Sequence, residues 1–442
     1  MNALPLIAHE NLSRPVAWHP SGPISAARYL REVRDLAGRL PPARYVLNLC
    51  DDRYRFMVVF GAALVNGQTC VLPPNHAQRV LGQVRAACVD HVCVVDHAEA
   101  GHADAHAYPD DLGVRSNDDA VPLIAPDHVA ALVFTSGSTG DPRPNAKAWG
   151  RLVAGAHSER EALGLDAAQR YAYVGTVPPQ HMYGFESTVL LPMQTGGAVH
   201  ASRPLFARDV ATCLAQVPAP RVLITTPIHI RALLEEGPSL PPLARAVSAA
   251  APLAREPAED FERRYGCELR EIYGFTEAGM LATRRTSTED AWRLMPGIRL
   301  ERDGDGWCAL GGHVNGRPPF SDVIEMQGEA GFSLVGRAQD MVNIAGKRAS
   351  LGDLNHHLNR IPGVRDGVFH LPRGDGRRVQ RLMAFVVAPG MSEADIMAAL
   401  RPVIDPAFLP RPLIKVDALP RTASGKLPLD RLRELESMAW SG

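Results

Sequence analysis

The chain has 442 residues, which is too long for one ordinary hydrophobic core, so we expect two or three domains. Its 47 basic and 48 acidic residues nearly cancel, so charge gives no argument for nucleic acid or an anionic membrane as a partner. Seven scattered cysteines without C-x-x-C spacing do not support a zinc site or a disulfide framework, and they predict reduced thiols in a cytoplasmic protein. We expect neither a signal peptide nor a membrane span, because proline interrupts the first residues and the apolar runs are short.

The first 100 residues alternate between two patterns. Apolar residues at helical spacing predict helices, and short apolar runs between them predict buried strands. The expected elements are, in order, a helix at 24–40, a strand at 45–50, a helix at 53–66, a strand at 69–72, a helix at 78–88 and a strand at 92–95. Such alternation favours parallel sheets covered by helices, and a polar loop is expected at 97–127.

The segment ALVFTSGSTGDPRPNAKAW, residues 131–149, is the most informative stretch. Four apolar residues predict a strand, and the six that follow, Thr135–Gly140, are all Thr, Ser or Gly. Glycine lets the backbone approach a ligand closely, so amides and hydroxyls can converge as donors. With Arg143 and Lys147 nearby, this concavity suits a polyphosphate. The Walker spacing and the G-x-G-x-x-G pattern are both absent, and a flexible surface turn is the alternative interpretation.

Two later strands are also expected to end in loops of small or polar residues. A helix at 151–163, an irregular turn entering an apolar helix at 176–197 and a strand at 221–226 come first. SAAAPL then ends a strand predicted at 247–253, a helix follows at 256–265, and FTEAG ends the strand ELREIYG. Ligands in such folds bind at the carboxyl ends of the strands, so we expect these loops to share one site with TSGSTG.

The character of the chain changes beyond Gly336. The pattern there predicts a helix at 350–360, strands at 367–370 and 382–388, and a helix at 392–404. This predicts a small α+β domain of the usual minimum size, with its boundary between Arg337 and Asp340. The domains expected are therefore 1–337 and 338–442.

Four motifs in order, TSGSTG with its basic tail, YGFTE, VGRAQDMVNIAGKR and PRTASGK, resemble those of the adenylate-forming superfamily. The resemblance covers about residues 45–432 and includes acyl- and aryl-CoA synthetases, peptide-synthetase adenylation domains and luciferases. It implies a large α/β N-terminal domain with mainly parallel sheets covered by helices, and a small mobile α+β C-terminal domain. It also implies the chemistry: a carboxylate attacks the α-phosphate of ATP, releasing pyrophosphate, and a thiol then displaces AMP.

The resemblance assigns the phosphate-binding residues one by one. The loop that cradles the β- and γ-phosphates is Thr135, Ser136, Gly137, Ser138, Thr139 and Gly140. Its cation would come from Arg143 or Lys147, since the usual Pro-Lys is Pro-Arg here. Thr276 would contact the α-phosphate, and Glu277 would hold Mg²⁺, which prefers oxygen ligands.

Other positions match the nucleoside and catalytic residues of the family. Tyr273, followed by Gly274, matches the aromatic that packs on adenine, and Ala250 and Ala251 match the small residues across from it. The remaining matches are Asp322 for the ribose hydroxyls, Arg337 for ribose and phosphate, His181 between the acyl and pantetheine pockets, and Lys426 bridging the carboxylate and ATP. Rotation near Gln339 would exchange Lys426 for residues 343–348 before the thiol step.

The chain is short for this family and resembles compact ligases of aryl polyene pigment pathways. That likeness favours a small aromatic acid, such as a hydroxybenzoate, and the phosphopantetheine thiol of an acyl carrier protein. CoA is the alternative acceptor, because it presents the same pantetheine arm. A non-catalytic nucleotide-binding relative is the alternative of another class, and the missing Walker pattern disfavours a kinase.

Overall fold

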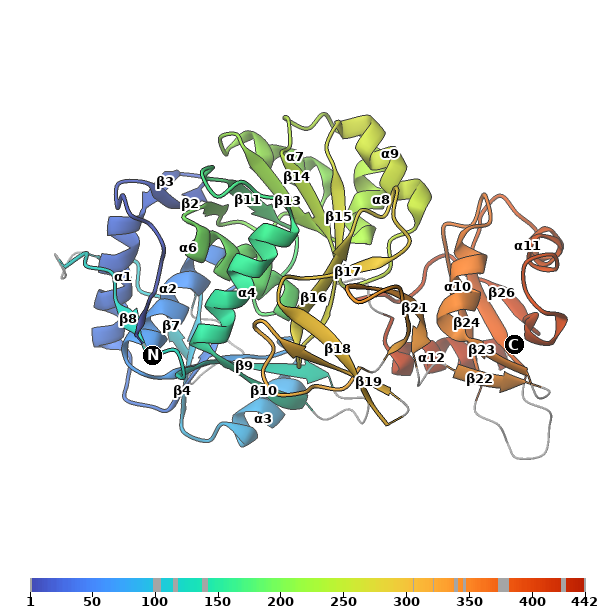
Figure 1. Ribbon diagram of the computed structural model, residues 1–442, viewed down its shortest axis with the longest axis horizontal. Helices are drawn as coiled ribbons and strands as arrows, with labels where there is room; N and C mark the ends of the chain where they lie inside the picture. The colour runs from blue at the N-terminus through green and yellow to red at the C-terminus, as the bar shows by residue number, and fades with distance from the viewer. Residues whose placement is uncertain are drawn as a thin grey trace.

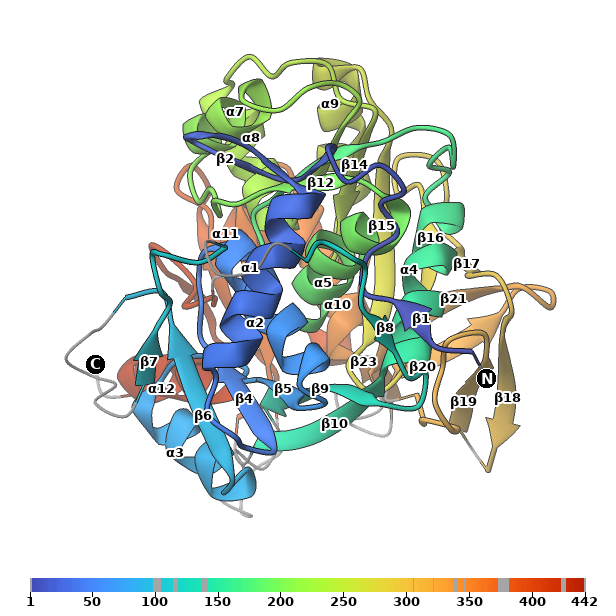
Figure 2. The ribbon, with the colours of Figure 1, turned by 90° about the vertical axis from the view of Figure 1, so that its left-hand side faces the viewer.

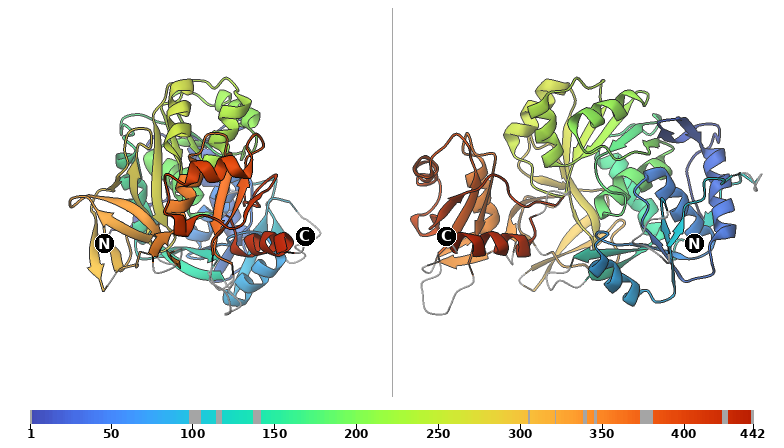
Figure 3. Two further views of the ribbon diagram at one scale, coloured as in Figure 1. Left: turned by 90° about the vertical axis from the view of Figure 1, so that its right-hand side faces the viewer. Right: turned by 180° about the vertical axis from the view of Figure 1, so that it is seen from behind.

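The computed structural model describes residues 2–97, 105–113, 118–136, 142–304, 306–320, 322–337, 341–344, 347–372, 381–422 and 427–440. Two bodies are visible in Figure 1: a large one made from the first three quarters of the chain, and a small one, coloured orange to red, beside it. Figure 3 shows the same division from the end and from behind. No helix within the described ranges combines the length and the hydrophobicity that a bilayer span requires.

The first sheet of the large body has six strands in the order β10-β9-β5-β4-β6-β7. All its pairs are parallel except β10 with β9. Its strands are β4 (Tyr45–Asn48), β5 (Thr69–Leu72), β6 (His91–Val95), β7 (Ala105–Ala107), β9 (Val129–Ser136) and β10 (Pro142–Ala148). Helix α3 (Gln78–Ala87) covers its outer face, where Leu81 and Val84 pack on Leu47 and Val71.

The second sheet has eleven strands, and its centre is parallel from β15 through β14, β13, β11 and β12 to β2. These strands are β2 (Pro15–His19), β11 (Ala172–Gly175), β12 (Ala198–His200), β13 (Arg221–Thr225), β14 (Arg245–Ser248) and β15 (Leu269–Phe275). Antiparallel strands extend both edges: β3 (Gly22–Ser25), β16 (Gly279–Arg284), β17 (Trp292–Leu294), β20 (Asp322–Met326) and β21 (Gly331–Arg337). Two small pairs stand apart, β1 (Leu4–Pro5) with β8 (Leu123–Ile124) and β18 (Ile298–Asp303) with β19 (Gly306–Gly311).

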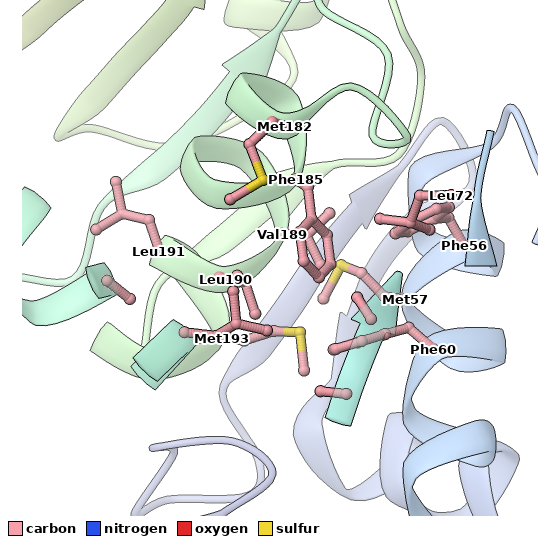
Figure 4. Close-up of a cluster of buried hydrophobic side chains, with 14 of the residues drawn as sticks. Phe56, Met57, Phe60, Leu72, Met182, Phe185, Val189, Leu190, Leu191 and Met193 are labelled. Atoms are coloured by element: carbon pink, nitrogen blue, oxygen red, sulfur yellow. The ribbon is translucent and has the colours of Figure 1, made fainter. Parts of the chain in front are cut away.

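A layer of helices lies between the two sheets (Figure 2). It contains α1 (Ala26–Arg39), α2 (Arg53–Val65), α4 (Trp149–Ala162), α5 (Met182–Phe185), the π-helix η1 (Glu186–Leu190) and α6 (Leu191–Thr195). From Phe56 onward helix α2 carries only apolar residues and glycine, which is typical of a helix buried on every side. Figure 4 shows Phe56 and Phe60 of α2 against Phe185, with ring centroids 6.3 and 5.2 Å away.

Helices α7 (Ala207–Ala215), α8 (Pro227–Glu236) and α9 (Arg255–Tyr265) cover the outer face of the second sheet (Figure 1). The small body has a three-stranded sheet of β24 (Asp366–His370), β25 (Met383–Val387) and β26 (Leu413–Lys415), with a hairpin of β22 (Met341–Ile344) and β23 (Lys347–Ser350). Its helices are α10 (Leu351–Asn359), α11 (Glu393–Leu400), the 3₁₀ turn η3 (Pro406–Phe408) and α12 (Leu429–Trp440).

The predicted fold class is confirmed, but several predicted elements were wrong. The strand expected at 247–253 ends at Ser248, and the helix expected at 392–404 ends at Leu400. Strand β10 occupies a segment that looked like an irregular tail, and β7 and β8 lie within the expected long loop. The expected boundary at 338–340 lies outside the described residues.

Candidate active site

A tight turn at residues 276–278 joins β15 to β16 at the carboxyl end of the second sheet. Phe275 pairs with Gly279 across the turn, so Thr276 and Glu277 are held at its tip. A Cβ atom on Gly274 would lie 2.4 Å from the carbonyl oxygen of Gly279, so only glycine allows the two strands to approach this closely. Gly274 therefore shapes the turn that presents Thr276 and Glu277.

Tyr273 and Asp322 form a hydrogen-bonded pair beside this turn. The Tyr273 hydroxyl donates to Asp322 Oδ2 at 2.5 Å, and its ring packs on Phe320 at 5.9 Å and Trp292 at 5.5 Å. Asp322 pairs across β20 and β21 with Arg337, whose backbone is described but whose side chain is not. The three residues assigned to the nucleoside thus meet in one place. An aromatic face next to a hydrogen-bonded carboxylate suits a purine nucleoside.

The neighbouring strand β14 ends in a strained loop. Ala250 has φ +74°, a left-handed conformation that costs a non-glycine residue roughly 1–2 kcal/mol. The buried carboxylate of Glu271 anchors the loop by accepting from the Leu253 amide at 3.0 Å, while Arg284 donates to the same carboxylate. Backbone strain held by surrounding contacts is common at ligand sites. Ala250 and Ala251 thus lie in an anchored loop after β14, the parallel neighbour of the strand that carries Tyr273.

His181 follows β11, which lies two strands beyond β14 in the sheet, and it stands immediately before α5. The Tyr183 hydroxyl donates to the Val247 carbonyl at 3.1 Å, which ties α5 to the end of β14. A Cβ on Gly184 would lie 1.9 Å from the Pro178 carbonyl oxygen, so glycine is required for the sharp entry into this helix. The π-helix that follows is of a type often found at functional sites.

The phosphate loop is only partly described. Thr135 and Ser136 end β9, with the Ser136 side chain not described, and Gly137, Ser138, Thr139 and Gly140 lie outside the described residues. Arg143 pairs with Thr135 across β10 and is exposed. Lys147 is instead 8 % exposed, and its ammonium group donates to the carbonyls of Thr276 and Glu277, the latter at 3.0 Å. Of the two cations, Arg143 is the exposed one, while the printed hydrogen bonds of Lys147 go to the backbone of the turn.

The donor set at the turn fits Mg²⁺ together with a phosphate. Glu277 is exposed, and it directly follows Thr276, whose side chain carries a hydroxyl group. Magnesium is commonly bound by one or two carboxylates plus substrate phosphate oxygens, so a single exposed acid is the right kind of partner. Lys426 and Gln339 lie outside the described residues.

Sequence reasoning missed two buried side chains behind the turn, Glu186 and His313. The Met280 amide donates to the Glu186 carboxylate, and His313 Nε2 donates to the Met280 carbonyl at 2.7 Å. Burial raises the pKa of Glu186 to about 7, an effect that Lys147 opposes. Positions 147, 186 and 313 share no periodicity, so no sequence pattern could have linked them.

A buried histidine, His229, lies at the carboxyl ends of β11 and β13. His229 Nδ1 lies 2.9 Å from the Thr226 hydroxyl and 3.3 Å from that of Thr176. Burial, with a smaller effect from Arg203, lowers the pKa of His229 to about 4. The imidazole is therefore neutral at physiological pH.

We expect His229 to make the protein less stable in mild acid. Its pKa is about 6.5 when unfolded and about 4 when folded, so between those values the unfolded state takes up a proton that the folded state refuses. The free energy of unfolding falls as pH falls through this window, by up to about 3 kcal/mol. Urea unfolding of wild type and His229→Gln from pH 7.5 to 4.5 checks this. The stability advantage of the wild type should shrink toward pH 4.5, and a constant difference would contradict the prediction; other titrating groups cancel in the comparison.

Comparison with known proteins agrees with this geometry. The family model described as AMP-binding enzyme matches residues 42–300, and AMP-binding enzyme C-terminal domain matches residues 358–426. A 4-coumarate–CoA ligase of Rhodobacter capsulatus is 32 % identical over 69 % of this chain and 76 % of its own. A 3-hydroxybenzoate–CoA/4-hydroxybenzoate–CoA ligase of Thauera aromatica is 24 % identical over 71 % and 64 %. The crystal structure of the anthranilate CoA ligase AuaEII with anthranoyl-AMP superposes with a TM-score of 0.84, at 16 % identity over 99 % of both chains.

The chain belongs to the AMP-binding enzyme family. It is an AMP-forming ligase that joins a carboxylic acid to a thiol.

Proposed function

We propose that this ligase activates a small aromatic carboxylic acid with ATP and Mg²⁺. The acid's carboxylate oxygen bonds to the α-phosphorus, the bond to the β-phosphate breaks, and pyrophosphate leaves with its electrons. A pantetheine thiol then attacks the acyl carbonyl, loses its proton and displaces AMP. The carrying observation is the meeting of the Tyr273–Asp322 pair with the Thr276–Glu277 turn at the end of the parallel strands.

The site residues divide this work among themselves. The Tyr273 ring and the Asp322 carboxylate would bind and orient the nucleoside, with Arg337 opposite Asp322 in the hairpin. Thr276 would donate to the α-phosphate, and Glu277 would hold the metal that neutralises charge on the phosphates. His181, at the start of α5, would border the acyl and pantetheine pockets.

The aromatic acid is supported by the relatives, which are named as ligases of 4-coumarate and of hydroxybenzoates. The acceptor is a thiol at the end of a pantetheine arm. The relatives' names support CoA, whereas the compact length supports the phosphopantetheine of an acyl carrier protein. Both acceptors present the same arm to the site, so the assay must distinguish them.

The test is acid-dependent release of pyrophosphate from ATP and Mg²⁺, across matched panels of aryl and fatty acids. Each acid is assayed without acceptor, with CoA and with holo carrier protein. We expect release with aryl acids and multiple turnover with one acceptor, which identifies the thiol. Release with fatty acids alone would overturn the aromatic substrate. If folded protein that binds ATP released no pyrophosphate with any acid, the proposal as a whole would be overturned.

A further inference from the structure

The turn that presents Thr276 and Glu277 is held from beneath by side chains of three distant segments. Lys147 of β10 donates to the carbonyls of both turn residues. Glu186 of η1 accepts from the Met280 amide, and His313 donates to the Met280 carbonyl. The backbone of the turn and of the next strand is therefore fixed by side chains and not by strand pairing alone.

Lys147 is the part of this support that comes from the strand following the phosphate loop in the chain. It lies on β10, which begins at Pro142 and pairs with β9, so the strand leaves the glycine-rich segment and passes directly under the turn. Its ammonium group is buried, and burial lowers the pKa of Lys147 while the charges of Glu186 and Glu277 oppose that change. Burying an ammonium group costs solvation free energy, and here the two hydrogen bonds to backbone carbonyls offset part of that cost. Those two hydrogen bonds are therefore the structural role that the buried lysine performs.

Glu186 makes the local charge balance unusual. It is 6 % exposed, and a Cβ on Gly279 would lie 2.7 Å from its Oε1 atom, so it sits directly behind the turn. Other titratable groups lie close by: Lys147 and Arg151 add to the effect of burial in lowering the pKa of His313, and the charge of Glu186 adds to the effect of burial in raising the pKa of Glu159. A cavity of about 20 Å³, large enough for one water molecule, lies between Lys147, Glu186 and His313.

We propose that Lys147 is a positioning residue that ties β10, the strand after the phosphate loop in the chain, to the turn carrying Thr276 and Glu277, by donating to both turn carbonyls. The proposal rests on the proposed function, because orientation of the turn affects activity only if Thr276 and Glu277 meet the α-phosphate and the metal. In this role Lys147 acts through the backbone of the turn and not through a contact of its own with the nucleotide. It fixes where the Thr276 hydroxyl and the Glu277 carboxylate point before ATP arrives, which is where positioning contributes most to rate.

The kinetic test compares wild type with Lys147→Met, which keeps the length and apolar stem but removes the donors. We expect kcat for acid-dependent pyrophosphate release to fall at least about 30-fold while KM for ATP changes less than about threefold. The matched control is Lys415→Met, because Lys415 also donates to a backbone carbonyl, that of Met391 at 2.6 Å, but lies in the small body. A loss confined to KM, or an equal loss in the control, would overturn the proposal.

A double variant separates positioning from simple charge neutralisation. If Lys147 served only to balance Glu186, then Lys147→Met combined with Glu186→Gln would regain the lost kcat. We expect no recovery, because the two turn carbonyls still lack their donor. Recovery to within about threefold of Glu186→Gln alone would overturn the positioning role.

Hydrogen exchange tests, without any substrate, whether Lys147 holds the turn at residues 276–278. In unliganded Lys147→Met, amides of the peptide 275–280 should exchange at least about tenfold faster, with the rest of the large body unchanged. Unchanged exchange of these amides would overturn the proposal that Lys147 holds the turn. If wild type releases no pyrophosphate with any acid, the proposed function fails, while this measurement still decides whether Lys147 holds the turn.

Discussion

Lys426→Ala is expected to remove acid adenylation while leaving the second half-reaction nearly intact. The family resemblance implies that this lysine bridges the substrate carboxylate and the ATP oxygens, two anionic groups that repel each other as they approach. Loss of one preorganised donor at such a point costs about 10²–10³-fold in kcat. Thiol attack on supplied acyl-adenylate needs no such bridge, so its rate should stay within about threefold of wild type.

A contact of Arg421, which precedes Lys426 in the sequence, gives this prediction a structural basis. The Arg421 guanidinium forms two parallel hydrogen bonds with Asp366, at 2.6 and 2.7 Å, and so fastens the segment before Lys426 to the start of β24. Bidentate pairs of this kind fix geometry as well as contribute energy. The chain is therefore anchored to the sheet of the small body at Arg421, which precedes Lys426 in the sequence.

The measurement follows pyrophosphate release and, separately, thioester formation from synthetic acyl-adenylate. Lys415→Ala is the control, since it removes an exposed lysine from the same body. Arg421→Ala should lie between the control and Lys426→Ala in the first assay, because it loosens the anchor but keeps the cation. Equal loss of both half-reactions in Lys426→Ala would contradict the assigned role.

The parallel core could be predicted from sequence because its signals are local. Buried strands such as β5 and β13 are short apolar runs, and α1 carries its apolar residues at helical spacing. Strand β10 was missed because Pro142 and Pro144 argue against a strand. It lies at the edge of its sheet, where a missing amide donor is tolerated.

The candidate site could be predicted only as far as its motifs extend. Tyr273, Thr276 and Glu277 lie in one continuous stretch, and the structure also brings Asp322 to Tyr273. Nothing in the sequence indicated that Lys147 lies under the turn or that Ala250 is left-handed. Such features depend on contacts between segments more than 100 residues apart, or on strain imposed by them, and neither leaves a local pattern.

Arg53→Met is expected to be the most destabilising of the substitutions considered, by about 4 kcal/mol or more. Arg53 is completely buried at the start of α2, and its five hydrogen bonds reach Thr188 and four carbonyls. No carboxylate in the described ranges lies within ion-pair distance of it. Burial lowers the pKa of Arg53 to about 10, so it stays charged at neutral pH. Removal leaves buried carbonyls without a donor, each at a cost of about 1–3 kcal/mol.

The four carbonyls explain why this arginine also matters to the site. Those of Gly175 and Val177 belong to the end of β11 and the turn leading to His181. That of His200 belongs to the last residue of β12, and that of Ser202 follows the strand. One guanidinium thus fixes two neighbouring strand ends relative to α2. We expect Arg53→Lys, which has fewer donors in a different geometry, to lose less stability but still to lower activity.

Urea unfolding measures the effect, with Arg221→Met as the matched control. Arg221 Nε also donates to two carbonyls, those of Leu214 and Val217, but its side chain is partly exposed, so water can replace it. We expect the control to lose about 1 kcal/mol or less. Equal losses for the two methionine variants would mean that burial does not amplify the cost, and that the strand ends around His181 are held by packing and not by Arg53.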